Sequence, residues 1–230
     1  TALLVIGLTA AILLLSAALM MRSPPARASG QPTAKDGNSL AEARRNLVFW
    51  RLCAVQFLVF PAMMSIPLHF PVHGTDLGMS KSTAAQLLSV IGFSSIAGRL
   101  TVGALVDRIG GKNSYALCIL VFMAGLFSFV FITTPWPLFV ATAFYGFGHG
   151  GLFTVVSPTV AAYFGMRAHG AIFGTILFFG TLGGAVGPIL VGLAFDRTGS
   201  YQPAFIALAV AAALGLVLVA TMPAPRRSGP

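Results

Sequence analysis

Arg99 is a charged side chain within a long apolar stretch, residues 82–106. It lies about seven residues, or roughly 10 Å at 1.5 Å per residue, inside the nearer end of that stretch. A charge at such depth is costly and usually faces a cavity, a partner or a ligand. Its guanidinium can bind a carboxylate through two parallel hydrogen bonds, and Ser95, one helical turn earlier, adds a hydroxyl on the same face. The alternative is an arginine that extends to the nearby interface or braces the following loop.

His149 is the second side chain that could carry chemistry, within the glycine-rich run GFGHGG at 146–151. No Asp or Glu lies inside the apolar stretches, so His149 is the one side chain at mid-depth that changes charge near neutral pH. With Tyr145 one turn away, it is a candidate for proton coupling. The alternative is a neutral imidazole that is hydrogen-bonded to a carbonyl exposed by the surrounding glycines.

The tetrapeptide Asp-Arg-x-Gly occurs twice, at 107–110 and 196–199, and each copy closes an apolar stretch. We interpret Asp107 and Arg108 as gating residues, because the Asp107 carboxylate could pair with Arg167 or with the positive end of the helix expected from residue 170. An exposed ion pair of this kind contributes roughly 0–1 kcal/mol. Asp196 is the expected counterpart in the second copy.

A set of small residues on the stretch 170–194 predicts close helix packing. Glycines four residues apart let two helix backbones approach each other, and a proline bends a helix. The residues concerned, which we interpret as packing and hinge positions, are Gly180, Gly183, Gly184, Gly187 and Pro188.

Other chemistry is not indicated by the sequence. The run Gly110-Gly111-Lys112 lacks the earlier glycine and the following Ser or Thr of a phosphate-binding loop, and metal-ligand spacings and nucleophile elbows are absent. Cys53 and Cys118 fall within apolar stretches, so we expect two small buried side chains rather than a disulfide or a metal pair. We therefore expect no enzyme, no cofactor and no metal. Nucleic acid is excluded as a partner, because the basic residues are scattered through loops.

The elements that position these residues must be membrane helices. Apolar residues make up 57% of the chain and charged residues 8%, against about 25% charged in a soluble domain. Backbone amides in lipid need internal partners, which a helix provides. We expect seven spans, at 1–21, 47–69, 82–106, 114–134, 137–163, 170–194 and 203–222. A polar linker, 22–46, is expected to be mobile, and a tail follows at 223–230.

The positive-inside rule predicts which side each loop faces. Ten basic residues fall on one side: Arg22, Arg27, Lys35, Arg44, Arg45, Arg108, Lys112, Arg167, Arg226 and Arg227. Only Lys81 and Arg197 fall on the other. The linker and the tail are therefore predicted to be cytoplasmic, in what we expect to be a bacterial cytoplasmic (inner) membrane. Because Thr1 begins directly in apolar sequence, we also expect the chain to be a fragment of a longer protein.

Three predicted spans separate Asp107 from Asp196, so the two copies of the tetrapeptide must face opposite sides of the membrane. The six spans from residue 47 to residue 222 then form two triplets of opposite orientation. Such inverted repeats are a common architecture of secondary transporters.

This arrangement, preceded by a basic linker, resembles the second half of a major facilitator superfamily transporter. The residues from Gly98-Arg99 through Asp107-Arg108 and Gly110 to Lys112 resemble the signature loop of that superfamily. Further residues resemble its monocarboxylate and oxalate/formate branch: His69, Pro71, Asp76-Leu77-Gly78, Gly92, Tyr163-Phe164-Gly165, Gly183-Gly184, Gly187-Pro188 and Asp196. The resemblance implies an all-α, major-facilitator-type bundle that holds the last seven of twelve spans. Residues 1–21 would then be the sixth span.

Two departures bear on the substrate that this resemblance implies. Animal monocarboxylate carriers have an acidic residue where this chain has Ser95, and oxalate/formate antiporters have a Lys on the helix that corresponds to 170–194, which has none. A monoanion is therefore favoured over a dianion such as oxalate.

The implied function is secondary transport of a small organic anion, a monocarboxylate, by alternating access, with Arg99 and Ser95 at the substrate. Its expected partners are that anion, a proton or counter-anion, the bilayer and the N-terminal half of the same protein. One alternative is a carrier of sugars, drugs or neutral metabolites in which Arg99 is structural. The other is a seven-helix receptor, which the inverted tetrapeptides disfavour. A retinal protein would also need a Lys in 203–222.

Overall fold

The computed structural model describes residues 2–20 and 37–225, which belong to two separate units. The first unit contains α1 (Ala2–Met20), an apolar helix that covers most of the span predicted at 1–21. The second is a helical bundle. The predicted mobility of the linker concerns mostly residues 22–36, which lie outside the described residues, as do the five basic residues Arg22, Arg27, Lys35, Arg226 and Arg227.

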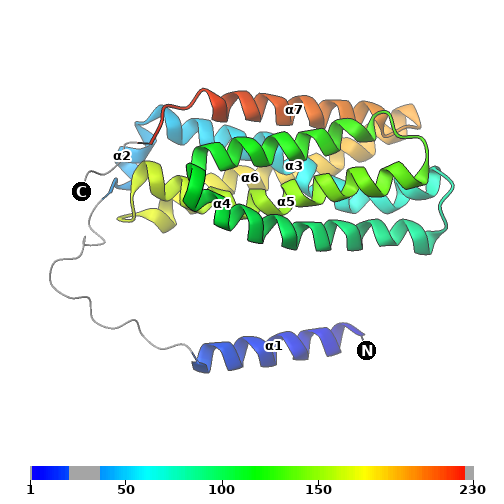
Figure 1. The fold of residues 1–230 in the computed structure, drawn as a ribbon, viewed down its shortest axis with the longest axis horizontal. Coiled ribbons are helices and arrows are strands. Elements are labelled where there is room, and N and C mark those ends of the chain that lie inside the picture. The colour runs from blue at the N-terminus through cyan, green and yellow to red at the C-terminus, as the bar shows by residue number, and fades with distance from the viewer. Residues whose placement is uncertain (1, 21–36, 226–230) are drawn as a thin grey trace. The chain divides into compact units, whose positions relative to one another are not determined.

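The bundle is made of long helices (Figure 1). They are α2 (Leu40–Arg44), α3 (Leu47–Asp76), α4 (Lys81–Phe129), α5 (Pro135–Phe164), α6 (His169–Thr198) and α7 (Gln202–Ala220). Among the described residues, all of these except the five-residue α2 are long and apolar enough to cross a membrane.

Helix α4 contains two of the predicted spans. Its 49 residues would reach about 73 Å as one straight helix, more than twice the roughly 30 Å hydrocarbon thickness of a bilayer. Gly110 breaks it, with φ 81° and ψ 161°, a conformation that glycine adopts without strain. We call the helical segments before and after Gly110 the first and second rods of α4. They run in opposite directions in Figure 1. The bundle therefore contains the six spans expected between residues 47 and 222.

Helix α5 packs between the two rods of α4 through glycines. A Cβ added at Gly98 of the first rod would lie 2.1 Å from the Phe147 carbonyl oxygen of α5. A Cβ added at Gly148 would lie 2.6 Å from the Phe122 amide nitrogen of the second rod. Neither contact leaves room for a side chain. The helices of this part of the bundle thus approach each other backbone to backbone.

Helix α3 is longer than the span predicted at 47–69, because it continues through Pro67 and Pro71 to Asp76. A proline in a helix leaves the carbonyl four residues earlier without its amide partner, here that of Met63. The Tyr145 hydroxyl lies 3.1 Å from the Ala62 carbonyl oxygen and 3.4 Å from that of Met63, and donates to them. Partners supplied by neighbouring helices let membrane helices keep such prolines, which the sequence prediction did not allow for.

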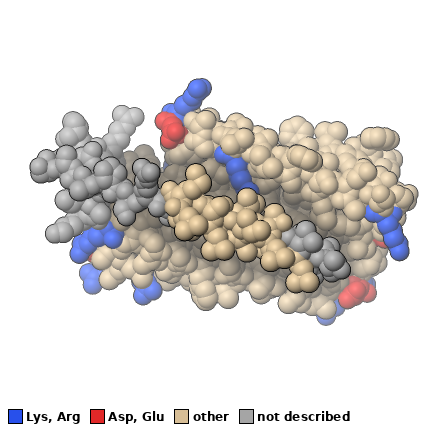
Figure 2. All heavy atoms as spheres, turned by 90° about the horizontal axis from the view of Figure 1, so that it is seen from below, with Lys and Arg blue, Asp and Glu red and all other residues tan. Residues whose placement is uncertain are grey.

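Charged side chains gather near the two ends of the bundle, and the wall between them is mostly uncharged (Figure 2). At one end, which we call the basic end, three helices donate to the last backbone carbonyls after α7. Arg51 Nη1 lies 2.7 Å from the Thr221 oxygen, Tyr163 Oη lies 2.6 Å from the Pro223 oxygen, and Lys112 Nζ donates to the Met222 oxygen. These donors cap the negative end of α7.

Candidate functional site: a cation and a histidine between α4 and α5

Arg99 lies on the first rod of α4, and its side chain is exposed on the wall of the bundle. The guanidinium carbon lies 5.5 Å from the centre of the Phe153 ring of α5, which places the cation over the aromatic face. Such contacts contribute about 0.5–1 kcal/mol at exposed sites. Arg99 makes no ion pair or hydrogen bond with residues 37–225. Its N–H groups are therefore available to a ligand on that side.

Ser95 and His149 meet beside this cation. Ser95 is buried, and its Oγ lies 3.5 Å from His149 Nδ1, at the limit of a hydrogen bond. Gly150 makes the approach possible, because a Cβ there would lie 2.0 Å from the Ser95 carbonyl oxygen. The His149 ring also packs edge-on against Phe153, at 5.2 Å between centroids. The predicted residues Arg99, Ser95 and His149 thus lie in one cluster, with Phe153 at its centre.

Tyr145 adjoins the cluster but has a structural partner. Its ring lies 5.8 Å from that of His149, while its fully buried hydroxyl donates to the α3 carbonyls described above. The sequence alternative for His149, a bond to an exposed carbonyl, is not what the described residues form, since the hydroxyl of Ser95 faces the ring instead. That hydroxyl comes from a different helix, so spacing along α5 could not indicate it.

The proposed gating residues lie at the two ends of the bundle. Asp107, Arg108 and Arg167 are exposed at the basic end, and Asp107 forms no ion pair within the part of the chain that the structure describes. Asp196 is exposed at the opposite end. There, burial and the nearby charges of Asp76 and Asp196 raise the pKa of Tyr201. The two tetrapeptides do share one backbone role, since Gly110 and Gly199 end their helical segments with φ of 81° and 66°.

The glycines predicted to pack on α6 are all buried: Gly180, Gly183, Gly184 and Gly187. They lie against α3. A Cβ at Gly183 would be 2.4 Å from the Phe57 carbonyl oxygen, and one at Gly187 would be 2.6 Å from Pro61 Cα. Pro188 is linked to α3 as well, since its carbonyl oxygen lies 3.1 Å from His69 Nε2.

Two site residues, Phe153 and Phe60, could not be chosen from among the other phenylalanines by the sequence. The two rings lie 6.0 Å apart, edge to face, and Phe60 also borders Gly180 of α6. In sequence both look like any other phenylalanine of an apolar helix. The signal that was available is position, because Phe153 follows His149 by one turn and so shares its face.

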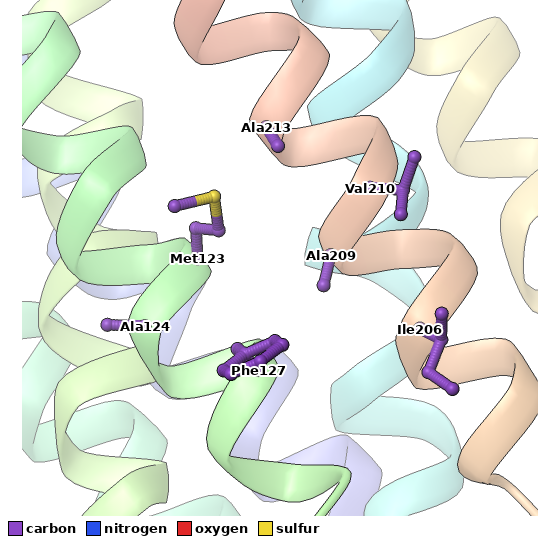
Figure 3. A pocket seen from close by; sticks show the side chains of 7 residues that line it. All are labelled: Met123, Ala124, Phe127, Ile206, Ala209, Val210 and Ala213. Carbon is purple, nitrogen blue, oxygen red and sulfur yellow. The ribbon is translucent and has the colours of Figure 1, made fainter.

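A hollow elsewhere in the bundle offers different chemistry. A groove of about 490 Å³ lies between the second rod of α4 and α7, and Figure 3 shows the side chains that line it. Seven apolar residues line it: Met123, Ala124, Phe127, Ile206, Ala209, Val210 and Ala213. It presents no charge or hydrogen-bond donor to an anion. The described residues also contain no cluster of His, Cys, Asp or Glu that could hold a metal.

The bundle thus has six spans, which are the two rods of α4 and the four further long helices α3, α5, α6 and α7. The sequence model of the Major Facilitator Superfamily matches residues 1–136 and 71–230. The chain belongs to this superfamily, and it is an integral membrane protein.

Curated relatives support the monocarboxylate branch. The chain is 30% identical over 164 residues to human monocarboxylate transporter 7, which covers 70% of this chain and 30% of that protein. It is 30% identical over 197 residues to chicken monocarboxylate transporter 9, covering 77% and 38%. The aspyridones efflux protein of Emericella nidulans is 27% identical over 154 residues, covering 65% and 31%. These relatives are transporters rather than enzymes, in agreement with the absence of catalytic motifs.

Solved structures show the same fold. The fucose transporter FucP in its outward conformation superposes with a TM-score of 0.68 at 19% identity, over 92% of this chain and 52% of FucP. The chain thus spans about half the length of that structure, and its matches cover 30–38% of the transporters 7 and 9. The expected bundle of major-facilitator type is confirmed.

Proposed function

We propose that the chain forms one half of a secondary transporter that moves a small organic monoanion, a monocarboxylate, by alternating access. The observation that carries the proposal is the Arg99 guanidinium, which is exposed over Phe153 and makes no ion pair with the described residues. A planar guanidinium can hold a carboxylate through two parallel bonds. The apolar rings of Phe153 and Phe60 beside it suit the hydrocarbon part of such an anion. The relatives named monocarboxylate transporters support the same substrate class.

The test is uptake of a labelled monocarboxylate by the full-length transporter in proteoliposomes. Arg99→Gln is expected to lower uptake at least 100-fold at equal protein abundance, because the carboxylate loses its charged partner. Arg99→Lys keeps the charge but not the two-pronged geometry, so uptake should be intermediate. Lys81→Gln is the matched control and should leave uptake unchanged. It removes an exposed cation from the first residue of α4, far from Arg99 along the same rod. Normal uptake by Arg99→Gln would remove Arg99 from the substrate site.

His149 is proposed as the proton-coupling residue, with Tyr145 as the neighbour that fixes its ring. A proton on His149 would make both ring nitrogens donors, so that Nδ1 would donate to the Ser95 hydroxyl, and it would add a positive charge beside Arg99. Substrate affinity and proton binding would then depend on each other. Uptake by the wild type is expected to vary with external pH, whereas uptake by His149→Gln should vary much less. Parallel pH profiles for the two proteins would show that the proton is carried elsewhere.

The exposed charges at the ends are proposed to form gates in another conformation of the carrier. Asp107 and Arg108 would act with Arg167 on the side that the basic loops predict to be cytoplasmic, and Asp196 on the other. Asp107→Asn is expected to slow transport without changing substrate affinity, since it alters the equilibrium between conformations and not the site. The bacterial cytoplasmic membrane stays a prediction for the location of the chain.

A second candidate function is export of a larger, drug-like metabolite. The observation that favours it is the likeness to the aspyridones efflux protein. The two candidates differ in the dependence on Arg99. If lactate, formate, oxalate and a sugar all fail to compete with a drug-like substrate, and Arg99→Gln still transports that substrate, the efflux function holds and Arg99 is structural.

A further inference from the structure

A second groove lies on the bundle, along α3 and away from the Arg99 cluster. A hollow of about 320 Å³ is lined by residues of α3, α6 and α7, among them Phe57, Pro61, Leu190 and Ala211. A hollow of about 340 Å³ continues from it and is lined by Trp50, Cys53, Ala54, Phe57, Phe179 and Leu182. The two share Phe57, so they lie end to end along α3. We call them together the α3 groove.

The part of the groove that α3 lines is about as long as one leaflet of a bilayer. It runs from Trp50 to Pro61, about 17 Å at 1.5 Å per residue, and beyond it the lining continues on α6 and α7 to Ala194 and Pro203. Half of a hydrocarbon core of roughly 30 Å is about 15 Å. The lining contains small and apolar side chains, and Trp50, which is 47% exposed, lies at the end nearest the basic loops. Tryptophan prefers this depth, where one edge of the ring meets the headgroups.

Two cations adjoin the Trp50 end of the α3 groove, which we call its mouth. Arg44 and Arg45, at the end of α2, are exposed and form no ion pair with residues 37–225. The backbone of Arg44 is fixed to the groove wall, because Trp50 Nε1 lies 2.9 Å from the Arg44 carbonyl oxygen and donates to it. The nearby carboxylate of Glu42 is engaged in a capping box, where it accepts from the Ser39 amide at 2.6 Å. These hydrogen bonds lower the pKa of Glu42 and keep it committed to α2.

We propose that the α3 groove binds an anionic glycerophospholipid from the leaflet at the basic end. Its phosphate would lie against Arg44 and Arg45, and one acyl chain would lie along α3 between α6 and α7. The charge at the mouth favours this occupant over a zwitterionic lipid, whose own ammonium group offsets its phosphate, and over an apolar helix of a second copy, which brings no anion. The groove of Figure 3 lies between α4 and α7, where one cation of the basic end, Lys112, already donates to the Met222 carbonyl. The proposal does not depend on which substrate is carried.

Quenching of Trp50 fluorescence by brominated phospholipids tests the proposal. Residues 1–230 contain two tryptophans, Trp50 and Trp136. In the full-length transporter with every tryptophan outside these residues replaced by Phe, Trp136→Phe leaves Trp50 as the reporter and Trp50→Phe leaves Trp136. In nanodiscs with the same low mole fraction of brominated phosphatidylglycerol or brominated phosphatidylcholine, Trp50 should be quenched preferentially by the anionic lipid. About fivefold preference is expected from each arginine that contacts the phosphate. Trp136, near the opposite end, should show no preference.

Charge variants separate a site from general attraction of anionic lipid to the basic end. Arg44→Gln and Arg45→Gln should each reduce the preference at Trp50 about fivefold. Arg108→Gln removes an exposed cation from the same end, on α4, which does not line the groove. It should leave the preference intact. Equal quenching of Trp50 by both lipids overturns the proposal, and so does an equal loss of preference in Arg108→Gln and Arg44→Gln.

Discussion

Two glycine-rich helix interfaces hold the bundle together, one between α4 and α5 and one between α3 and α6. We call them the α4/α5 seam and the α3/α6 seam, and they differ in what the glycines contact. In the α4/α5 seam, glycines of both helices meet the backbone of the other helix. A Cβ at Gly150 would lie 2.0 Å from the Ser95 carbonyl oxygen, and one at Gly125 would lie 2.7 Å from the Tyr145 amide nitrogen. Backbone cannot rotate out of the way. The relative position of α4 and α5 is therefore fixed.

The α3/α6 seam is built from glycines of α6 alone, and only half of them meet backbone. A Cβ at Gly180 would lie 3.1 Å from the Phe60 ring, and one at Gly184 would lie 2.8 Å from Met64 Cγ. Side chains can change rotamer where backbone cannot. This seam should therefore tolerate small shifts, which makes it the better position for a hinge. The difference predicts a graded response to the same change, glycine to alanine, at matched sites.

Gly150→Ala is expected to have the largest effect. The methyl group would overlap the Ser95 carbonyl and force α5 away from α4, and overpacking of this kind costs typically 1–3 kcal/mol, here about 3 or more. The better helix propensity of alanine offsets only about 1 kcal/mol. Thermal unfolding of the purified protein in detergent, followed by size-exclusion chromatography, measures the loss.

Gly103→Ala on α4 is the matched control for that substitution. The nearest atom to a Cβ there is Thr154 Cγ2 at 4.0 Å, an ordinary contact. This variant should be as stable as the wild type or slightly more stable. Equal stability of Gly150→Ala and Gly103→Ala would contradict the rigid α4/α5 seam.

Gly187→Ala tests the backbone contacts of the second seam and is expected to cost about 2 kcal/mol. Its Cβ would lie 2.6 Å from Pro61 Cα, but α6 can move slightly because its neighbouring contacts include side chains. Gly192→Ala, five residues further along α6, serves as the control. A Cβ there would meet only His69 Cε1, at 3.7 Å. A loss as large as that of Gly150→Ala would make the two seams equivalent and would remove the argument for a hinge.

The sequence predicted one of these seams and missed the other. The pairs Gly180/Gly184 and Gly183/Gly187 indicated packing on α6, because glycines four residues apart share a helix face. Gly146 and Gly150 are also four residues apart, and both meet the first rod of α4, but Gly148 between them meets the second rod. From the sequence alone, this run is interpreted only as the surroundings of His149. Which rod each glycine meets is a tertiary fact. The spacing of glycines along one helix does not reveal which rod of α4 each glycine contacts.

The same limit separates what could be predicted of the fold from what could be predicted of the site. The six spans, the break near Gly110 and the opposite ends of the two tetrapeptides follow from hydropathy and counting. Arg99 was identifiable because a charge in an apolar segment is rare. The contact of Arg99 with Phe153, and that of Ser95 with His149, join residues 54 positions apart in sequence. Such contacts depend on the α4/α5 seam and leave no local pattern.

Gly180→Ala is expected to have the smallest effect on stability and a distinct effect on function. The Phe60 ring must give way by a few tenths of an ångström, which should change the free energy of unfolding by less than about 1 kcal/mol. Phe60 packs on Phe153, which lies under Arg99, so the displaced ring should alter the apolar side of the proposed substrate site. We expect a several-fold change in the KM for a monocarboxylate at nearly unchanged stability. A variant that unfolds as readily as Gly187→Ala would show that Phe60 is held as firmly as backbone, and that the α3/α6 seam has no adjustable part next to the site.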